Sequence, residues 1–203
     1  ASSGTSNVKN PITLAADIMN HSEHVFLSGK GAENFAKNRN LEIVNNEYFH
    51  TKFRYNQLLN KKGEDKYGTV GCVAIDVNGN IVAGTSTGGM TNKKWGRIGD
   101  SPIIGAGTYA NNSTCGISST GSGEYFIRTV AAYQVSSLLE NHNYDLKKAM
   151  YKVIHEKIGG IGGDGGMIGI DKNSNISMEF NTPGMYRAYV NKYGEKEIFL
   201  YEE

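Results

Sequence analysis

The fold class is decided by TVGCVAID (residues 69–76), which is followed by VNGN (77–80) and IVAG (81–84). Apolar residues recur in these runs with a period of two, and an Asn-Gly pair between two such runs is typical of a tight β-hairpin. A similar layout occurs at residues 167–180, where MIGID and ISMEF flank KNSN. The sequence therefore predicts two β-hairpins separated by about eighty residues of chain.

Helices and further strands are predicted around these hairpins from helical spacing, capping residues and glycine breaks. Helices are expected from Pro11 after an Asn10 cap, at 31–39, within 46–60, at 124–139 and at 145–158, and strands at 24–27, 102–110 and 114–119. Residues 60–66 form a charged connector that we expect to be exposed. Strands separated by runs of helices, without a regular βαβ alternation, favour an antiparallel α+β fold with packed sheets and helices outside.

The composition excludes several classes of protein. The 203 residues include 26 glycines without a three-residue period and only 3 prolines, which argues against collagen and against a proline-rich linker. A formal net charge of +1 gives no bulk attraction to nucleic acid or to an acidic membrane surface, and no apolar run is long enough to span a bilayer. A small polar ligand is not excluded as a partner. The chain begins with Ala1 rather than methionine, so the compartment stays undecided: the cytoplasm is favoured, with periplasm or secretion left open.

Three familiar motifs are present without the context that they require. Residues 84–88 fit G-x-S-x-G, but no helix is predicted after them, which argues against a serine triad. The glycine runs at 105–110 and 160–165 match dinucleotide fingerprints, yet neither opens a helix after a strand. His21 and His24 have no third ligand at a plausible spacing, so no catalytic metal is expected.

The two cysteines are too few and too far apart for a disulfide framework or a C-x-x-C pair. Cys72 and Cys115 are therefore predicted to be buried free thiols.

Hydroxyl groups and glycines gather around one charged loop. They occur at 68–71, 86–89, 97–100 and 118–123. Each threonine taken alone is an ordinary β-branched strand residue. Arg97 and Asp100, three apart in a glycine-containing loop, are suited to the carboxylate and the ammonium of an α-amino acid, although a local surface salt bridge is the simpler alternative.

Several ordered motifs resemble the plant-type asparaginases, or isoaspartyl peptidases, of the N-terminal-nucleophile hydrolase superfamily. The motifs are GTVG (68–71), TSTGGMTNK (85–93), GRIGDSP (96–102), GAGTYA (105–110), TGSGE (120–124) and FNTPGMYR (180–187). Upstream, KNP (9–11), GAENFA (31–36) and RYNQLL (54–59) are similar to the later half of the first subunit of that family.

The resemblance implies an α+β fold of the αββα sandwich type, made as a precursor that cuts itself between Gly68 and Thr69. Residues 1–68 would be the C-terminal part of an α subunit ending in an exposed linker, and 69–203 would be the β subunit, within one structural domain. The family's N-terminal strand with its His-Gly-Gly turn does not occur in this sequence, so we expect a truncated chain whose sheet lacks N-terminal strands.

The resemblance also implies a role for each site residue. Thr69 would be the nucleophile, with its free α-amine as the base, and Thr87 would orient it. The Thr120 hydroxyl and the Gly121 amide would form the oxyanion hole.

The same resemblance assigns the substrate contacts. Arg97 would hold the substrate α-carboxylate, Asp100 its α-ammonium, and Gly121 and Gly123 would add backbone contacts. The implied reaction is hydrolysis of L-asparagine or a β-aspartyl dipeptide through a threonine acyl-enzyme. No cofactor is implied beyond a structural sodium, whose loop does not occur in this sequence, and two cleaved αβ units would form a homodimer.

Two alternatives stay open. The related glycosylasparaginases usually carry an aspartate before the nucleophile, where this chain has Gly68, so this activity ranks second. The other alternative is a fold relative that neither matures nor catalyses.

Overall fold

The computed structural model describes residues 1–59 and 68–201, which form two compact units. The N-terminal unit comprises residues 1–68 and 88–98, and the C-terminal unit comprises 69–87 and 99–203. The predicted connector at 60–66 lies outside the described residues. The mixture of helices and antiparallel sheet confirms the predicted α+β class.

The N-terminal unit is mainly helical. Its elements are β1 (Ser2–Ser3), α1 (Pro11–His21), β2 (Leu27–Ser28), α2 (Gly29–Asn38), a 3-10 turn (Asn46–Phe49) and α3 (Lys52–Leu59). The predicted helices are confirmed, and Asn10 caps α1 by accepting a hydrogen bond from the Thr13 N–H at 3.3 Å. The strand predicted at 24–27 is wrong except at its last residue, because only Leu27–Ser28 pairs with β1.

A small core holds this unit together. Helices α1 and α2 bury apolar residues at helical spacing against the segments on either side of them. The fully buried members are Val8, Leu14, Ile18, Ala32 and Ala36.

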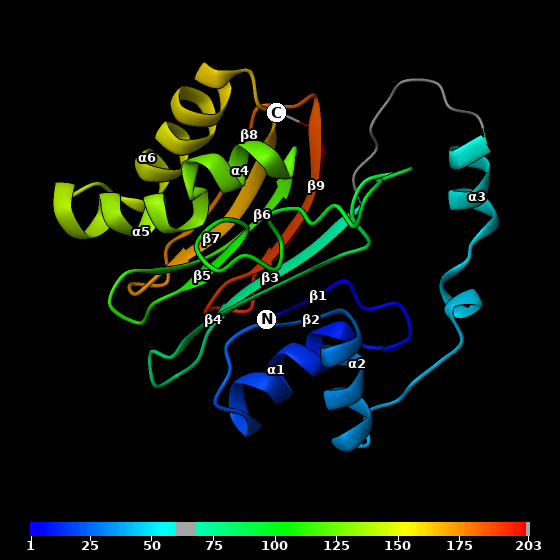
Figure 1. Cartoon of the computed structure of the whole chain (residues 1–203). Coiled ribbons are helices and arrows are strands. Elements are labelled where there is room, and N and C mark those ends of the chain that lie inside the picture. The colour runs from blue at the N-terminus through cyan, green and yellow to red at the C-terminus, as the bar shows by residue number, and fades with distance from the viewer. Residues whose placement is uncertain (60–67, 202–203) are drawn as a thin grey trace. The chain divides into compact units, whose positions relative to one another are not determined.

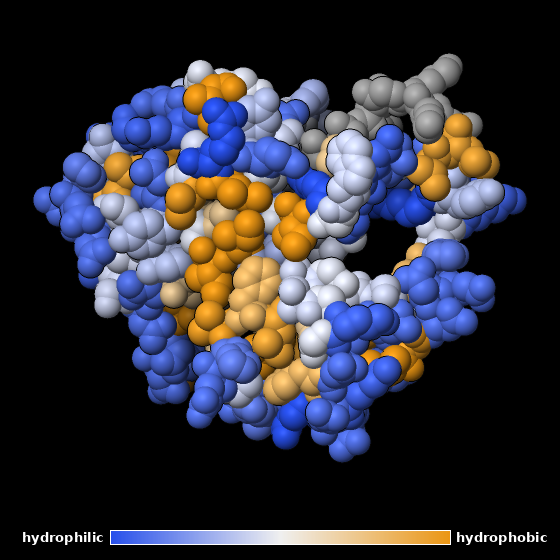
Figure 2. Space-filling model, viewed as in Figure 1, coloured by the Kyte–Doolittle hydropathy of each residue, from blue (hydrophilic) through white to orange (hydrophobic). Residues whose placement is uncertain are grey.

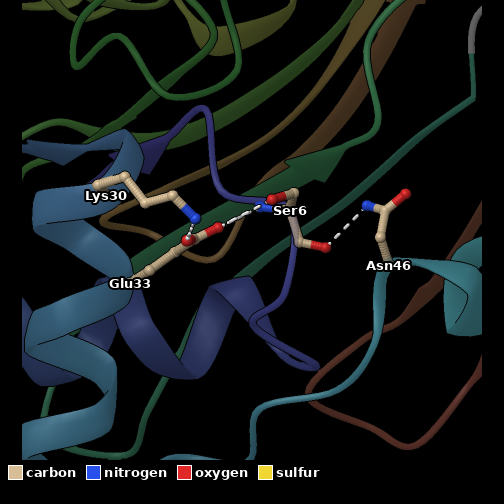
Figure 3. Close-up of polar contacts among 4 residues, drawn as sticks. All are labelled: Ser6, Lys30, Glu33 and Asn46. Carbon is tan, nitrogen blue, oxygen red and sulfur yellow. Dashed lines mark hydrogen bonds and ion pairs between the residues drawn. The ribbon is translucent and has the colours of Figure 1, made fainter.

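A buried carboxylate ties the first residues of the chain to α2 (Figure 3). Glu33 is only 3% exposed, and its Oε1 accepts hydrogen bonds from the Ser6 N–H at 2.8 Å and the Ser6 hydroxyl at 2.9 Å. The Lys30 ammonium donates to Oε2 at 2.9 Å, and Asn46 donates to the Ser6 carbonyl. The Ser6 backbone donor, followed by Lys30, lowers the pKa of Glu33 to about 2.

The C-terminal unit is built on antiparallel strands. The strands are β3 (Thr69–Ile75), β4 (Ile81–Thr87), β5 (Thr108–Ala110), β6 (Cys115–Gly121), β7 (Gly165–Asp171), β8 (Ile176–Phe180), β9 (Gly184–Val190) and β10 (Lys196–Tyr201). Strands β5-β6-β7-β8 form one sheet in that order, while β3–β4 and β9–β10 are separate hairpins. Both predicted hairpins are confirmed. The strand predicted at 102–110 is mostly wrong, because only Thr108–Ala110 forms a strand and Ile104 adds an isolated bridge.

Helices follow β6. They are α4 (Gly123–Thr129), α5 (Ala131–His142), α6 (Leu146–Tyr151), a π-helix (Lys152–Ile158) and a 3-10 turn (Gly159–Ile161). The single helix predicted at 124–139 is instead broken at Val130, whose φ is +49°. The helix predicted at 145–158 is confirmed in extent, with its second half wound as a π-helix.

The four-stranded sheet has helices on one face and the β3–β4 hairpin on the other (Figure 1). Cys115 and Ile117 of β6 pack into the core formed with the helices. The alternate residues Gly116 and Ser118 face the hairpin, since a Cβ at Gly116 would lie 2.7 Å from Ile81 Cγ2. Cys115 is buried as predicted, and burial raises the pKa of its thiol to about 12.

The other face of the hairpin is apolar and exposed. Val70 is 75% and Val82 60% exposed, and Cys72, on the same face, is exposed as well, so its predicted burial is wrong. Hydrophobic residues also gather on the face of the molecule drawn in Figure 2. Within the described part of the chain, no helix has both the length and the apolar character needed to cross a membrane.

Candidate active site

Thr69 and Thr87 form a cross-strand pair. Thr69 is the first residue of β3, and the antiparallel register places it directly opposite Thr87, the last residue of β4. Residues opposite one another in such a pair project from the same face of the ladder at close range. Thr69 therefore stands at the open end of the hairpin, immediately after Gly68.

Thr120 and Gly121 end strand β6. They pair with Gly166 and Gly165 of β7. Gly121 has φ +138°, and a Cβ there would lie 2.5 Å from the Asp164 carbonyl oxygen, so only glycine fits. The chain turns here into α4, whose first residue is the buried Gly123.

The contacts between the β3–β4 hairpin and the four-stranded sheet show which end of β4 lies near which end of β6. Ile81 of β4 lies against Gly116 of β6, and Thr85 lies farther along β4 against Ser118, farther along β6. The two strands therefore run in the same direction. Two residues on, the next positions facing this interface are Thr87 and Thr120. Thr69 pairs with Thr87, so these two threonines, Thr120 and Gly121 all lie beyond the Thr85–Ser118 contact, toward the same end of the interface. We refer to Thr69, Thr87 and Thr120 as the threonine cluster.

The residues predicted to hold the substrate fall in both units. Asp100 belongs to the C-terminal unit and is 5% exposed. Its main chain packs closely on Gly107, because a Cβ added to Gly107 would lie 2.6 Å from the Asp100 carbonyl oxygen. Arg97 belongs to the N-terminal unit, as does Gly68. Arg97 is half-buried, and its N–H donates to the Lys94 carbonyl at 2.9 Å.

A chain of hydroxyl groups next to the threonine cluster was missed by the sequence analysis. Thr108 Oγ1 donates to Thr85 Oγ1 at 2.5 Å, and Thr85 Oγ1 lies 2.6 Å from Ser118 Oγ. Ser118 in turn reaches the Gly84 carbonyl at 3.4 Å. Part of the signal was readable, because Thr85 alternates with Thr87 and must share its face of the strand.

The motifs set aside from the sequence lie in other settings. Ser86 is inside β4, and the chain after Thr87 is a loop, so the strand-to-helix turn of a nucleophile elbow is missing at this serine. The glycine runs at 105–110 and 160–165 lead into strands β5 and β7. Among residues 1–59 and 68–201, no group of three or more His, Cys, Asp or Glu side chains is arranged to hold a metal ion.

Comparison with known proteins identifies the family. A family model described as asparaginase matches residues 1–200. The chain is 47% identical to an isoaspartyl peptidase of Escherichia coli, with 93% of this chain and 64% of that protein aligned. It is 44% identical to a putative isoaspartyl peptidase/L-asparaginase of Dictyostelium discoideum, covering 92% and 66% of the two chains. It is 37% identical to a probable isoaspartyl peptidase/L-asparaginase 2 of Arabidopsis thaliana, covering 100% and 71%.

The match covers only part of the length of each relative. The chain spans slightly less than two thirds of the length of the first two proteins. Within that span the similarity runs through nearly the whole chain, including all of the threonine cluster. The chain belongs to the asparaginase family.

Proposed function

We propose that the protein is a self-processing amidohydrolase that hydrolyses the side-chain amide of L-asparagine and the isopeptide bond of β-aspartyl dipeptides, with Thr69 as its nucleophile. The names of the relatives support this substrate class. The observation that carries the proposal is the register of Thr69 with Thr87, at the end of the interface where Thr120 and Gly121 terminate β6.

Maturation would cut the chain before Thr69. The Thr69 Oγ attacks the Gly68 carbonyl carbon, the C–N bond breaks, and the peptide becomes an ester with a free Thr69 amine. Water then adds to the ester and releases the Gly68 carboxylate, which restores the Thr69 hydroxyl. Residues 1–68 and 69–203 would then be separate chains.

The freed amine supplies the base for turnover. An α-amine has a reference pKa of about 7.7 to 8.0, so near neutral pH part of the population accepts the hydroxyl proton of the same residue. The hydroxyl attacks the substrate side-chain carbonyl and expels ammonia or an amino acid. Water then cleaves the β-aspartyl ester on Thr69 and yields aspartate.

The developing oxyanion would be held by the Thr120 hydroxyl and the Gly121 N–H. Loss of one donor of this kind typically costs about 2.7 to 4 kcal/mol of barrier. Thr87 would orient the Thr69 hydroxyl across the strand pair. Because one residue supplies both nucleophile and base, no step in this mechanism calls for a cofactor.

Arg97 and Asp100 would select the aspartyl half of the substrate. A guanidinium matches the planar carboxylate with two parallel hydrogen bonds, and the Asp100 carboxylate complements the α-ammonium. Gly121 and Gly123 would add backbone contacts. Both asparagine and β-aspartyl dipeptides present this same half, so the proposal includes both.

We also propose the finer architecture that the family resemblance implies. The hairpin stacked on a helix-covered sheet supports an αββα sandwich as the complete fold. Residues 1–68 and 69–203 would be its two subunits, and two cleaved units would associate as a dimer. Light scattering of the cleaved protein would measure that association.

Thr69→Ala tests the mechanism directly. We expect the wild type to yield fragments 1–68 and 69–203 by intact mass spectrometry and to release ammonia from L-asparagine. Thr69→Ala removes the only hydroxyl proposed to attack, so the chain should stay intact and turnover should fall to background. Thr69→Ser keeps a hydroxyl and should retain both processing and turnover at reduced rates.

Three results would contradict the proposal. A fully processed Thr69→Ala protein would show that another group performs the cleavage. A wild-type chain that stays intact, with no acyl adduct on Thr69 after incubation with substrate, would favour a non-processing relative. Cleavage with turnover of sugar-linked asparagine alone would favour a glycosylasparaginase activity.

A further inference from the structure

We propose that the hydroxyl chain of Thr108, Thr85 and Ser118 is a positioning device that fixes the nucleophile hairpin relative to the strand end that forms the oxyanion hole. None of these three residues has a role in the chemistry proposed above. The inference rests on the proposed function, because it concerns the alignment of Thr69 with Thr120 and Gly121.

The hydroxyl chain links β4 to β6 two residues before Thr87 and Thr120 on their strands. Thr85 lies two residues before Thr87 on β4, and Ser118 two residues before Thr120 on β6. The 2.6 Å contact between Thr85 Oγ1 and Ser118 Oγ therefore bridges hairpin and sheet directly beside the threonine cluster. Thr108 extends the bridge to β5, with the Ser101 carbonyl also within reach at 3.1 Å.

Gly71 makes the close approach available. Gly71 lies on β3 and pairs with Thr85 of β4, and a Cβ at Gly71 would lie 2.2 Å from Ser118 Oγ. A Cβ at that position would displace the Ser118 hydroxyl or the hairpin, and either movement would break the bridge. Gly71 is also two residues after Thr69, so the nucleophile, the glycine and the hydroxyl bridge occupy consecutive positions on one face.

Hydrogen bonds between the hydroxyl groups can fix the position of β4 along β6, which apolar packing alone does not. The neighbouring contact of Ile81 with Gly116 is apolar, and apolar contact tolerates small sliding movements because it has no preferred direction. Hydrogen bonds weaken steeply with distance and angle. The Ile81 N–H also donates to Asn112 Oδ1 at 2.8 Å, but at the other end of β4. The hydroxyl chain is therefore a directional contact beside the threonine cluster that helps to specify where Thr69 stands relative to Gly121.

Thr85→Val is the first test, because valine keeps the shape and removes the hydroxyl. A misplacement of about 1 Å can cost on the order of 10²-fold in rate. We expect kcat for L-asparagine, counted per cleaved chain by intact mass, to fall tenfold or more, with KM unchanged within about twofold. Thr85→Ser restores the hydroxyl and should return kcat to within about threefold of the wild type.

Thr114→Val is a matched control. Thr114, the residue before β6, and Ser136 of α5 form a buried hydroxyl pair of similar length, 2.7 Å, in the same unit. Position 114 is six residues before Thr120 in the sequence and precedes the start of β6, away from the end that carries Thr120. Both valine variants should lower the melting temperature by similar amounts, and only Thr85→Val should lower kcat.

The outcomes separate the two proposals. If the wild type neither cleaves itself nor turns over asparagine, the proposed function fails. If the wild type is active and Thr85→Val has unchanged kcat, or loses only stability as Thr114→Val does, the positioning role is overturned. Should Thr85→Val not fold, Ser118→Ala breaks the same bridge with a smaller side chain, and an unchanged kcat there would overturn the role equally.

Discussion

At the scale of single residues, glycines determine how closely β6 and β7 approach at the end that carries the candidate site. Gly165 has φ +146°, and a Cβ there would lie 2.3 Å from the Thr120 carbonyl oxygen and 2.9 Å from Gly121 Cα. These neighbours are backbone atoms and cannot move aside alone. Gly165→Ala should therefore lower the free energy of unfolding by about 2 to 5 kcal/mol, from the strained backbone and from overpacking together. Urea denaturation would measure it.

Gly194→Ala is the control for backbone strain alone. Gly194 has φ +82° in the exposed turn between β9 and β10, and nothing lies within 4 Å of a Cβ built there. This variant should cost only about 1 to 2 kcal/mol. Equal losses of unfolding free energy at the two positions would show that the close approach of β6 and β7 adds nothing to the cost of Gly165→Ala.

At the scale of elements, Asn181 joins the end of β8 to the start of β7. Its Oδ1 accepts from the Gly165 N–H at 2.8 Å, its Nδ2 donates to the Gly163 carbonyl at 3.1 Å, and its own N–H donates to the Gly165 carbonyl at 3.0 Å. Asn181→Asp keeps the first bond and sets a carboxylate oxygen against the Gly163 carbonyl. We expect a loss of about 1 to 3 kcal/mol of stability at neutral pH, measured by urea denaturation, and faster hydrogen exchange at Gly165.

Asn141→Asp offers a comparison on the helix surface. The Asn141 amide also donates to a main-chain carbonyl, that of Ser137, but the residue is exposed. Its substitution should cost less than about 1 kcal/mol, including the unfavourable charge at the end of α5. A loss at Asn181 no larger than this would mean that the strand junction does not depend on its amide.

The same scale shows what the sequence could predict. The period-two runs around Asn78-Gly79 and residues 172–175 predicted both hairpins, because the signal there is local. The break at Val130 was not predictable, since it depends on the Gly105 and Ala106 carbonyls accepting from the N–H groups of Tyr133 and Ala132. The hairpin β9–β10 was overlooked although alternating residues flank a turn with Gly194.

The candidate site also combines residues that local motifs indicated with contacts that they could not indicate. Roles for Thr69, Thr87, Thr120 and Gly121 came from ordered motifs and remain predictions. The contact of Thr85 with Ser118 joins residues 33 apart in sequence, so it depends on how hairpin and sheet stack. No local pattern encodes that stacking, and the hydroxyl chain became visible only in the structure.

At the scale of the whole molecule, the two units differ in their expected response to acid. The pKa of Glu33, lowered from 4.5 to about 2 by the Ser6 N–H and then by Lys30, belongs to the N-terminal unit. The pKa of Asp17 in the same unit is also lowered, chiefly by its hydrogen bond from Arg39. A carboxylate with a depressed folded pKa stabilises the fold above its unfolded pKa and loses that contribution as the pH falls through the folded value.

Glu33 should therefore make the N-terminal unit weaken between pH 4.5 and about 2, by up to about 3 kcal/mol if the whole shift is realised. In the C-terminal unit, the lowered pKa of Asp76, caused mainly by the Asn80 side chain, belongs to an exposed turn whose contribution to stability is small. Hydrogen exchange at pH 6 and pH 2.5, corrected for intrinsic rates, should show peptides from residues 1–59 losing protection first. Glu33→Gln should begin less stable at pH 6 and lose less on acidification, because its amide does not titrate. If Glu33→Gln loses as much protection between pH 6 and pH 2.5 as the wild type does, the acid sensitivity belongs to another carboxylate.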